Sequence, residues 1–272
     1  MQSEKGGRML DLKNLEKTFN PHTVHEKKAL QNVSLHLEKG DFATIVGSNG
    51  AGKSTLFNAI SGSFLLDRGS VVLDGQDITF LQEHKRSAFI GRLFQDPLMG
   101  TAPHMSIEEN LSVSYIRASG LSLFSRVGKK EKAYFREQLS LLGMGLEDRL
   151  SHPVGLLSGG QRQALTLLMA TMVTPKILLL DEHTAALDPG TAEKVLSLTK
   201  SIVQERQITC LMITHNMHQA LELGNRTLMM DSGKIVLDLS GAEREHLTVE
   251  DLLQLFSEKA GKVLDNDRIL LS

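Results

Sequence analysis

The sequence has a single cysteine, so no disulfide can form within the chain. That residue, Cys210, stands in the apolar run 208–213, a setting that favours a buried and unreactive thiol on a strand. The histidines show no clustered zinc-ligand spacing, and we predict no structural metal. Hydrophobic residues make up 41% and charged residues 23% of the chain, which excludes the disordered and collagen-like classes.

Long apolar runs and a strong charge of one sign are also missing. No run approaches the roughly 18 to 20 apolar residues that cross a bilayer, and the first residues lack the hydrophobic core of a signal peptide. The formal net charge is only -2, so the chain as a whole does not attract nucleic acid or anionic lipid. We therefore expect a cytoplasmic protein with no nucleic-acid partner.

The chain has 272 residues, enough for one large core or two modest ones, and a single two-lobed domain is expected. Its first part alternates like sheet. Val33, Leu35 and Leu37 share one face of a strand, and the strand 71–73 ends at the turn signal Asp74-Gly75. These patterns predict an antiparallel β layer.

Helical periods follow between residues 107 and 174. One helix face has apolar residues at i, i+3, i+4 and i+7, namely Leu165, Leu168, Met169 and Met172. The polar and basic stretch 124–132 lies between helical segments and is predicted to be a loop, with contact to a partner as the alternative. The segment 107–174 is therefore predicted to form a helical lobe.

Strands and helices alternate in the last part of the chain. A buried strand is predicted at 177–181, a helix at 191–206 and another strand at 208–214, and this order calls for a parallel sheet. A hairpin is predicted over 227–239, and a polar tail with one amphipathic helix at 249–256 follows it.

A phosphate-binding loop follows the predicted strand 42–46. The residues Gly47-Ser48-Asn49-Gly50-Ala51-Gly52-Lys53-Ser54 match the pattern G-x-x-x-x-G-K-[ST], and with Thr55 they form the predicted nucleotide-binding segment. Glycines let backbone N–H groups curl round phosphates, and the helix that follows directs its positive end at the anion. We expect Lys53 to bridge the β- and γ-phosphates of ATP, and Ser54 to give its hydroxyl to Mg²⁺.

Two acids end the buried strand 177–181. Asp181 is the predicted Mg²⁺-side acid, acting through water, and Glu182 is placed to orient and polarise the attacking water. Such a general-base role contributes about 10²- to 10⁴-fold in rate. The alternative is a pair of solvated carboxylates at a strand end, which the phosphate loop in the same chain disfavours.

A third motif lies between these two and identifies a family. It is Leu157-Ser158-Gly159-Gly160-Gln161, ahead of a long helix with an apolar face. The three motifs in this order resemble the nucleotide-binding subunits of ATP-binding-cassette (ABC) systems, over residues 9–240. The resemblance implies an α/β fold, a RecA-like P-loop nucleoside-triphosphatase core with a parallel sheet, an N-terminal antiparallel β layer and an inserted helical subdomain.

The resemblance also implies roles for four more residues, most of which have a structural alternative. Gln95 matches the glutamine that senses Mg²⁺ and the membrane partner, or it is a satisfied loop amide. Asp188 matches the loop that couples the two sites. His215 matches the switch histidine that contacts the γ-phosphate, or it caps a strand end. Phe19, placed before the β layer, matches the aromatic residue that stacks on adenine, or it belongs to the core.

His183 departs from the family pattern, because many ABC ATPases have a small residue or proline after the catalytic acid. A second histidine beside the γ-phosphate could tune the acid that polarises water, or it could pack in the interior. Both interpretations are open at this point.

The family pattern divides the chain into parts with different roles. The implied ABC ATPase domain is 1–272, with its catalytic core and β layer in 8–94 and 175–240, a helical signature subdomain in 95–174 and a tail in 241–272. Two copies of the chain are expected to enclose two ATP molecules, each site pairing one chain's phosphate loop with the signature residues of the other.

The expected function is that of an ATP-hydrolysing subunit, peripheral on the inner face of the cell membrane, that powers a transporter. Multispanning permease subunits are implied partners, and a solute-binding protein is an indirect one. The segments 156–172 and 181–189 resemble cassettes of amino-acid uptake systems, including aromatic amino acids, so an importer of a small solute is expected. The alternative is a soluble ABC ATPase acting on ribosomes or DNA, although such relatives usually have two cassettes or a long heptad insertion.

Overall fold

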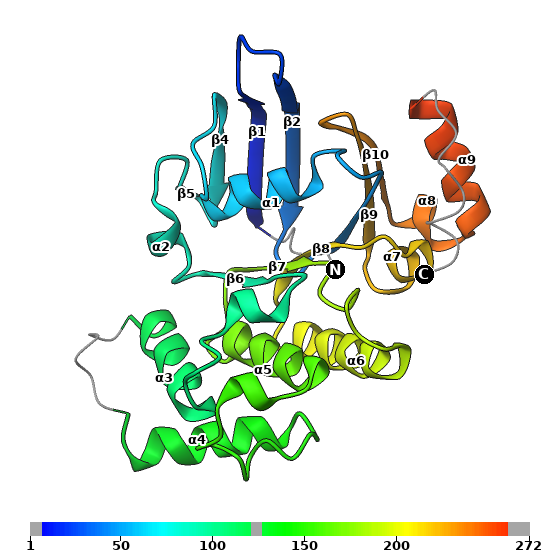
Figure 1. Cartoon of the computed structure of the whole chain (residues 1–272). Helices are drawn as coiled ribbons and strands as arrows, with labels where there is room; N and C mark the ends of the chain where they lie inside the picture. The colour runs from blue at the N-terminus through cyan, green and yellow to red at the C-terminus, as the bar shows by residue number, and fades with distance from the viewer. Residues whose placement is uncertain (1–6, 121–126, 261–272) are drawn as a thin grey trace. The chain divides into compact units, whose positions relative to one another are not determined.

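The computed structural model describes residues 7–120 and 127–260 (Figure 1). The chain forms two compact units: the first comprises Met1–Arg86 and Thr209–Ser272, and the second comprises Ser87–Ile208. The α/β class expected from the sequence is confirmed, because antiparallel and parallel strands both occur together with helices.

The first unit contains the predicted antiparallel layer. Its strands are β1 (Arg8–Phe19), β2 (Lys27–Glu38), β4 (Arg68–Leu73) and β5 (Gln76–Asp77), in the order β2-β1-β4-β5. On β2, the three alternating residues named above are at most 4% exposed, so the predicted buried face is confirmed.

Parallel strands form the second sheet region of this unit. The strand β3 (Phe42–Val46) lies between β8 (Thr209–Ile213) and β9 (Arg226–Asp231) and runs parallel to both, and β10 (Lys234–Ser240) returns antiparallel to β9. Every residue of β3 and β8 is buried, as expected for parallel strands covered on both faces. The predicted hairpin and the buried Cys210 thiol are both confirmed.

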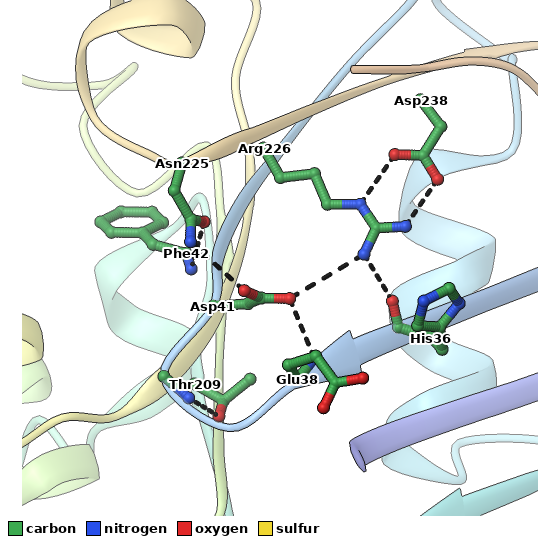
Figure 2. Close-up of polar contacts among 9 residues, drawn as sticks. His36, Glu38, Asp41, Phe42, Thr209, Asn225, Arg226 and Asp238 are labelled. Carbon is green, nitrogen blue, oxygen red and sulfur yellow. Dashed lines mark hydrogen bonds and ion pairs between the residues drawn. The ribbon is translucent and has the colours of Figure 1, made fainter. Parts of the chain in front are cut away.

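An arginine at the start of β9 ties the two groups of strands together (Figure 2). The guanidinium of Arg226 donates to both carboxylate oxygens of Asp238 at 2.7 and 2.6 Å and to the carbonyl of His36 on β2 at 2.7 Å. Asp41, in the turn before β3, lies 3.9 Å from the same guanidinium. The hydrogen bond to Asp238 raises the pKa of Arg226, so this side chain is a permanent cation at the junction.

The helices of the first unit are α1 (Lys53–Ser61), α2 (Glu83–Arg86), α7 (Met217–Glu222), α8 (Ala242–Glu245) and α9 (Val249–Ala260). The predicted tail helix is confirmed as α9. Its buried residues Leu252 and Phe256 pack in one cluster with Met217 of α7. Arg244 of α8 donates to the carbonyls of Ala220 and Leu221 at the end of α7, so the tail is docked on this helix.

The second unit pairs β6 (Ile90–Leu93) in parallel with β7 (Ile177–Asp181). Its helices are η1 (Pro97–Gly100), α3 (Ile107–Ala118), α4 (Lys129–Ser140), η2 (Val154–Leu156), α5 (Gly159–Thr171) and α6 (Pro189–Glu205). The predicted apolar face of α5 is confirmed, since its four residues pack in the hydrophobic cluster of this unit.

The prediction of a loop over 124–132 is wrong for its last four residues, because α4 begins at Lys129. The carboxylate of Glu131 accepts a hydrogen bond from the Gly128 backbone N–H at 2.8 Å and so caps the helix start. Phe135 and Leu139 are fully buried on the inner face of this helix. Residues 124–126 of the predicted loop lie outside the described residues.

No helix within the described ranges is both long and apolar enough to cross a bilayer.

Candidate functional site: a phosphate loop and a signature helix

The phosphate loop occupies the turn from β3 to α1, as the sequence predicts. Gly52 is the residue before α1 and has a φ of +105°, which a side chain rarely adopts. An added Cβ there would lie 2.6 Å from the carbonyl oxygen of Ala29 on β2. The close approach of two backbones therefore requires glycine at this position.

Lys53 folds back over the loop. Its Nζ donates to the carbonyl oxygens of Gly47 at 2.6 Å and Ser48 at 3.1 Å, and the residue is only 6% exposed. The ammonium group is thus held against the backbone of the phosphate loop. A positive group in this position is what the predicted phosphate contact requires.

The first turn of α1 is open to an anion. Within the described residues, no side chain caps this helix, because its N-cap residue is glycine. The backbone N–H groups of a helix start have no intrahelical partner, and the helix dipole favours negative charge there. Ser54 is exposed in this turn and Thr55 is half-buried, so both predicted nucleotide residues stand at the helix start.

Phe19 lies within the β layer, and the prediction that it stands before this layer is wrong. It is the last residue of β1 and is paired in register with Lys27 of β2. Its ring packs edge-on against Phe64, with 5.5 Å between centroids, and Lys17 lies 5.7 Å above it. Half-burial against Phe64 accounts for the side chain without a ligand, and stacking on adenine stays a prediction.

Lys27 is a residue that the motifs missed. Its Nζ lies 3.7 Å from the position that a Cβ would take on Gly50, so a second ammonium group stands beside the phosphate loop. The β1–β2 pairing places it there, and the sequence offered only a lysine pair ahead of the alternating residues of the predicted strand.

His215 follows β8 at the turn into α7. Thr214 accepts from the Asn216 backbone N–H at 3.1 Å, and Asn216 caps the helix by accepting from Gln219 N–H at 3.0 Å. These bonds fix the backbone on both sides of the half-buried His215. Its predicted role at the γ-phosphate is not tested by this geometry.

The acids of the second unit stand at the end of β7. Asp181 lies 3.9 Å from the guanidinium of Arg92 on β6, and both side chains are less than 15% exposed. Arg92 was missed in the sequence because it interrupts an otherwise apolar strand. The next residue, Glu182, has a φ of +45°, and its carbonyl accepts from Ala185 N–H at 3.0 Å.

His183 is buried, and its contacts support the interpretation that it packs in the interior. It is 1% exposed, and burial lowers its pKa to about 4, so the ring is neutral at physiological pH. Its Nε2 lies 3.1 Å from the hydroxyl of Thr199 on α6.

Gln95 is exposed just beyond β6. The preceding residue, Phe94, offers its carbonyl to the Gln163 amide of α5 at 3.4 Å. Gln163 is fully buried, so the loop that carries Gln95 is anchored to the signature helix. This link joins residues far apart in the chain, and no motif predicted it.

The signature residues form the start of α5. The hydroxyl of Ser158 accepts from Gln161 N–H, and the Gln161 side chain accepts from Ser158 N–H, both at 3.2 Å, which is a capping box. A Cβ on Gly160 would lie 2.0 Å from Thr191 Cγ2, so a side chain cannot be placed there unless the Thr191 side chain moves.

Thr191 also connects the signature residues to the predicted coupling loop. Asp188 is the N-cap of α6 and accepts from Thr191 N–H at 3.1 Å. Hydrogen bonds from Thr191 lower the pKa of the Asp188 carboxyl, so this exposed group is ionised. Within this unit, Gly160 and Asp188 therefore both lie next to Thr191.

A loop of this geometry between a buried parallel strand and an uncapped helix defines a P-loop nucleoside triphosphatase. The family model described as ABC transporter matches residues 30–185. The chain is 45% identical over 253 residues to "Tyrosine transport ATP-binding protein" of Clostridioides difficile (strain R20291), covering 91% of this chain and 98% of that protein.

Other relatives extend the likeness. The chain is 37% identical over 236 residues to "Methionine import ATP-binding protein MetN" of Mannheimia succiniciproducens, covering 84% of this chain but 64% of that protein. Among solved structures it matches the ATP-binding cassette MJ0796 in a dimeric post-hydrolysis state bound to ADP and Pi. The TM-score is 0.74 at 29% identity, over 85% of this chain and 98% of that chain.

The chain belongs to the ABC transporter family and is an ATP-binding cassette with the ATPase activity of that family. The expected fold class, ATP as the nucleotide and ATP hydrolysis are thereby confirmed. The roles of individual side chains stay predictions.

Proposed function

We propose that this chain is the ATPase subunit of a membrane importer for an amino acid, with an aromatic amino acid such as tyrosine as the favoured cargo. The names of its relatives support this proposal, because one is a tyrosine transport protein and another imports methionine. An ATPase subunit does not touch the transported solute, so the cargo would be selected by partners. These are multispanning permease subunits and, indirectly, a solute-binding protein.

The working form that we propose is a dimer of two copies with two ATP molecules between them. A dimeric state is described for MJ0796, which supports the proposal. Each nucleotide would contact the phosphate loop of one chain and Ser158 of the other. A hydroxyl that accepts from its own helix keeps its proton, so Ser158 can donate to a γ-phosphate. The helix dipole of α5 adds about 0.3 to 2 kcal/mol.

The chemistry of three predicted side chains suits a magnesium ion. Mg²⁺ is usually held by one or two carboxylates together with phosphate oxygens and water, and Asp181, Ser54 and Gln95 supply hard oxygen atoms of this kind. When bound, the ion would neutralise charge on the β- and γ-phosphates. The chain's own groups would do the rest: Lys53 binds phosphate, Glu182 orients the attacking water and accepts its proton, and His215 contacts the γ-phosphate.

The observation that carries the proposed ATPase mechanism is the presence in one ABC chain of Lys53, Glu182 and the helix-capping Ser158. We expect Glu182→Gln to keep ATP binding while turnover falls by about 10²- to 10⁴-fold, because the general base is lost and the side chain keeps its shape. ATP should then hold the variant as a dimer on a sizing column. Undiminished turnover would remove Glu182 from the proposed role.

The transport assignment has its own test. The tagged chain is purified from detergent-solubilised membranes, and its companions are identified by mass spectrometry. We expect a multispanning permease, which would support the proposed membrane association. Ribosomal proteins or DNA-binding factors in its place would contradict the transport role and leave the ATPase mechanism intact.

A further inference from the structure

A buried hydrogen bond joins the segment of Glu182 to the next helix. His183 Nε2 lies 3.1 Å from Thr199 Oγ1, and both residues are 1% exposed. His183 is the second residue after β7, next to Glu182, whereas Thr199 lies on the buried face of α6 between Val195 and Val203. The bond therefore fixes the backbone beside Glu182 to a helix of the same unit.

The hydroxyl of Thr199 decides which atom is the donor. Its Oγ1 lies 2.8 Å from the carbonyl oxygen of Val195, which can only accept. A hydroxyl has a single proton, and the shorter contact takes it. Thr199 therefore accepts from His183, and the imidazole ring carries its proton on Nε2.

The other ring nitrogen of His183 makes burial of this side chain unfavourable if it serves packing alone. Nδ1 of His183 is buried and makes no hydrogen bond within the described residues. A buried polar atom without a partner is destabilising, and an apolar side chain of similar size would avoid this penalty. The gain that offsets it is the bond to Thr199.

Glu182 supplies a second and independent observation. Its φ of +45° lies in the left-handed region, which is unfavourable for a residue with a Cβ. Most other described non-glycine residues with positive φ are Asn, Asp or His, the residue types that adopt this conformation most readily. Such a conformation persists only where neighbouring contacts hold it. Two contacts restrain the chain immediately after this residue: the hydrogen bond of His183 to Thr199, and the bond from Ala185 N–H to the Glu182 carbonyl.

We propose that His183 is a positioning residue, whose hydrogen bond to Thr199 holds the left-handed turn at Glu182 and so directs its carboxylate. The inference rests on the proposed function, because it assigns the positioned carboxylate to the attacking water. It requires no contact between His183 and the nucleotide.

The test compares two substitutions at the acceptor. Thr199→Val removes the hydroxyl and keeps the branched shape, whereas Thr199→Ser keeps the hydroxyl and removes a methyl group. Since a small misplacement of a reacting group can cost about 100-fold, we expect Thr199→Val to lower kcat by about 10- to 100-fold. ATP affinity in calorimetry should stay within about twofold, because Lys53 and its loop are untouched. Thr199→Ser should recover most of kcat.

Either of two results overturns the proposal: unchanged kcat in Thr199→Val, or an equal loss in both variants, which would indicate packing alone. If Thr199→Val fails to fold, the double variant His183→Leu with Thr199→Val removes both polar atoms together. Its kcat should be low in the folded state, and wild-type kcat there would also overturn the proposal.

Glu182→Gln, measured beside these variants, separates this inference from the proposed function. Wild-type turnover in Glu182→Gln would overturn the proposed function and the positioning role together. An inactive Glu182→Gln beside a fully active Thr199→Val would overturn the positioning role alone.

Discussion

The starts of α1 and α5 carry the candidate phosphate contacts, and they are built in opposite ways. Gly52 precedes α1 with a left-handed backbone and supplies no capping side chain. Ser158 begins α5 with a complete capping box, so that helix already satisfies part of its own start. The two helix starts therefore suit different roles. A bound phosphate would accept hydrogen bonds at the start of α1, whereas α5 is capped by its own side chain and offers a hydroxyl proton.

Lys53→Ala should cause the largest loss of ATP affinity among these variants. Removing one partner of a buried, hydrogen-bonded charge pair costs about 2 to 5 kcal/mol, which corresponds to roughly 30-fold to several thousandfold in ATP affinity. Calorimetric titration with ATP measures the loss. Lys27→Ala is the matched control, because its exposed ammonium beside the same loop should contribute less than about 1 kcal/mol. Equal losses in the two variants would contradict the assignment of Lys53.

Two glycine substitutions compare the backbone constraints at the starts of α1 and α5. Gly52→Ala forces a Cβ to within 2.6 Å of the Ala29 carbonyl at a φ of +105°, so we expect a loss of about 1 to 3 kcal/mol in unfolding free energy. Gly159→Ala meets only the end of Leu187 at 3.2 Å, and we expect a change of less than about 1 kcal/mol. Urea unfolding of both variants measures these values. The reverse order would show that the two helix starts do not differ as described.

The smallest expected effect concerns the cap itself. Ser158→Ala should cost about 1 kcal/mol of stability, because the hydroxyl no longer accepts from Gln161 N–H. ATP affinity of the single chain should not change, since the phosphate loop is intact. Ser158→Thr keeps a capping oxygen and should retain most of the stability. A clear loss of ATP affinity in Ser158→Ala would place this residue in the nucleotide site of its own chain.

Sequence reasoning found the functional residues that lie close together in the chain and form one local motif. The phosphate loop and the strand 177–181 are where the motifs placed them, because a strand, a turn and a helix start are built from neighbouring residues. The heptad-like apolar face of α5 was visible for the same reason.

The residues that were missed depend on packing between distant segments. Lys27 reaches the phosphate loop through the register of β1 and β2, and Gln163 meets Phe94 across a separation of 69 residues. The placement of Phe19 failed because strand ends are set by pairing rather than by local propensity. The left-handed backbone of Glu182 has no sequence signal, since glutamate rarely adopts it.

In the proposed dimer, the α1 start of one chain and the α5 start of another form one nucleotide site. This arrangement can be tested by mixing two variants, both in the Glu182→Gln background. Lys53→Ala lacks the phosphate-loop half of the nucleotide site, and Ser158→Arg lacks the signature half. Analytical ultracentrifugation with ATP should find monomers for each variant alone and dimers in the mixture, since one complete site forms only between unlike chains. ATP-dependent dimers of the Ser158→Arg chain alone would contradict the account, as would a monomeric mixture under conditions where Glu182→Gln itself dimerises.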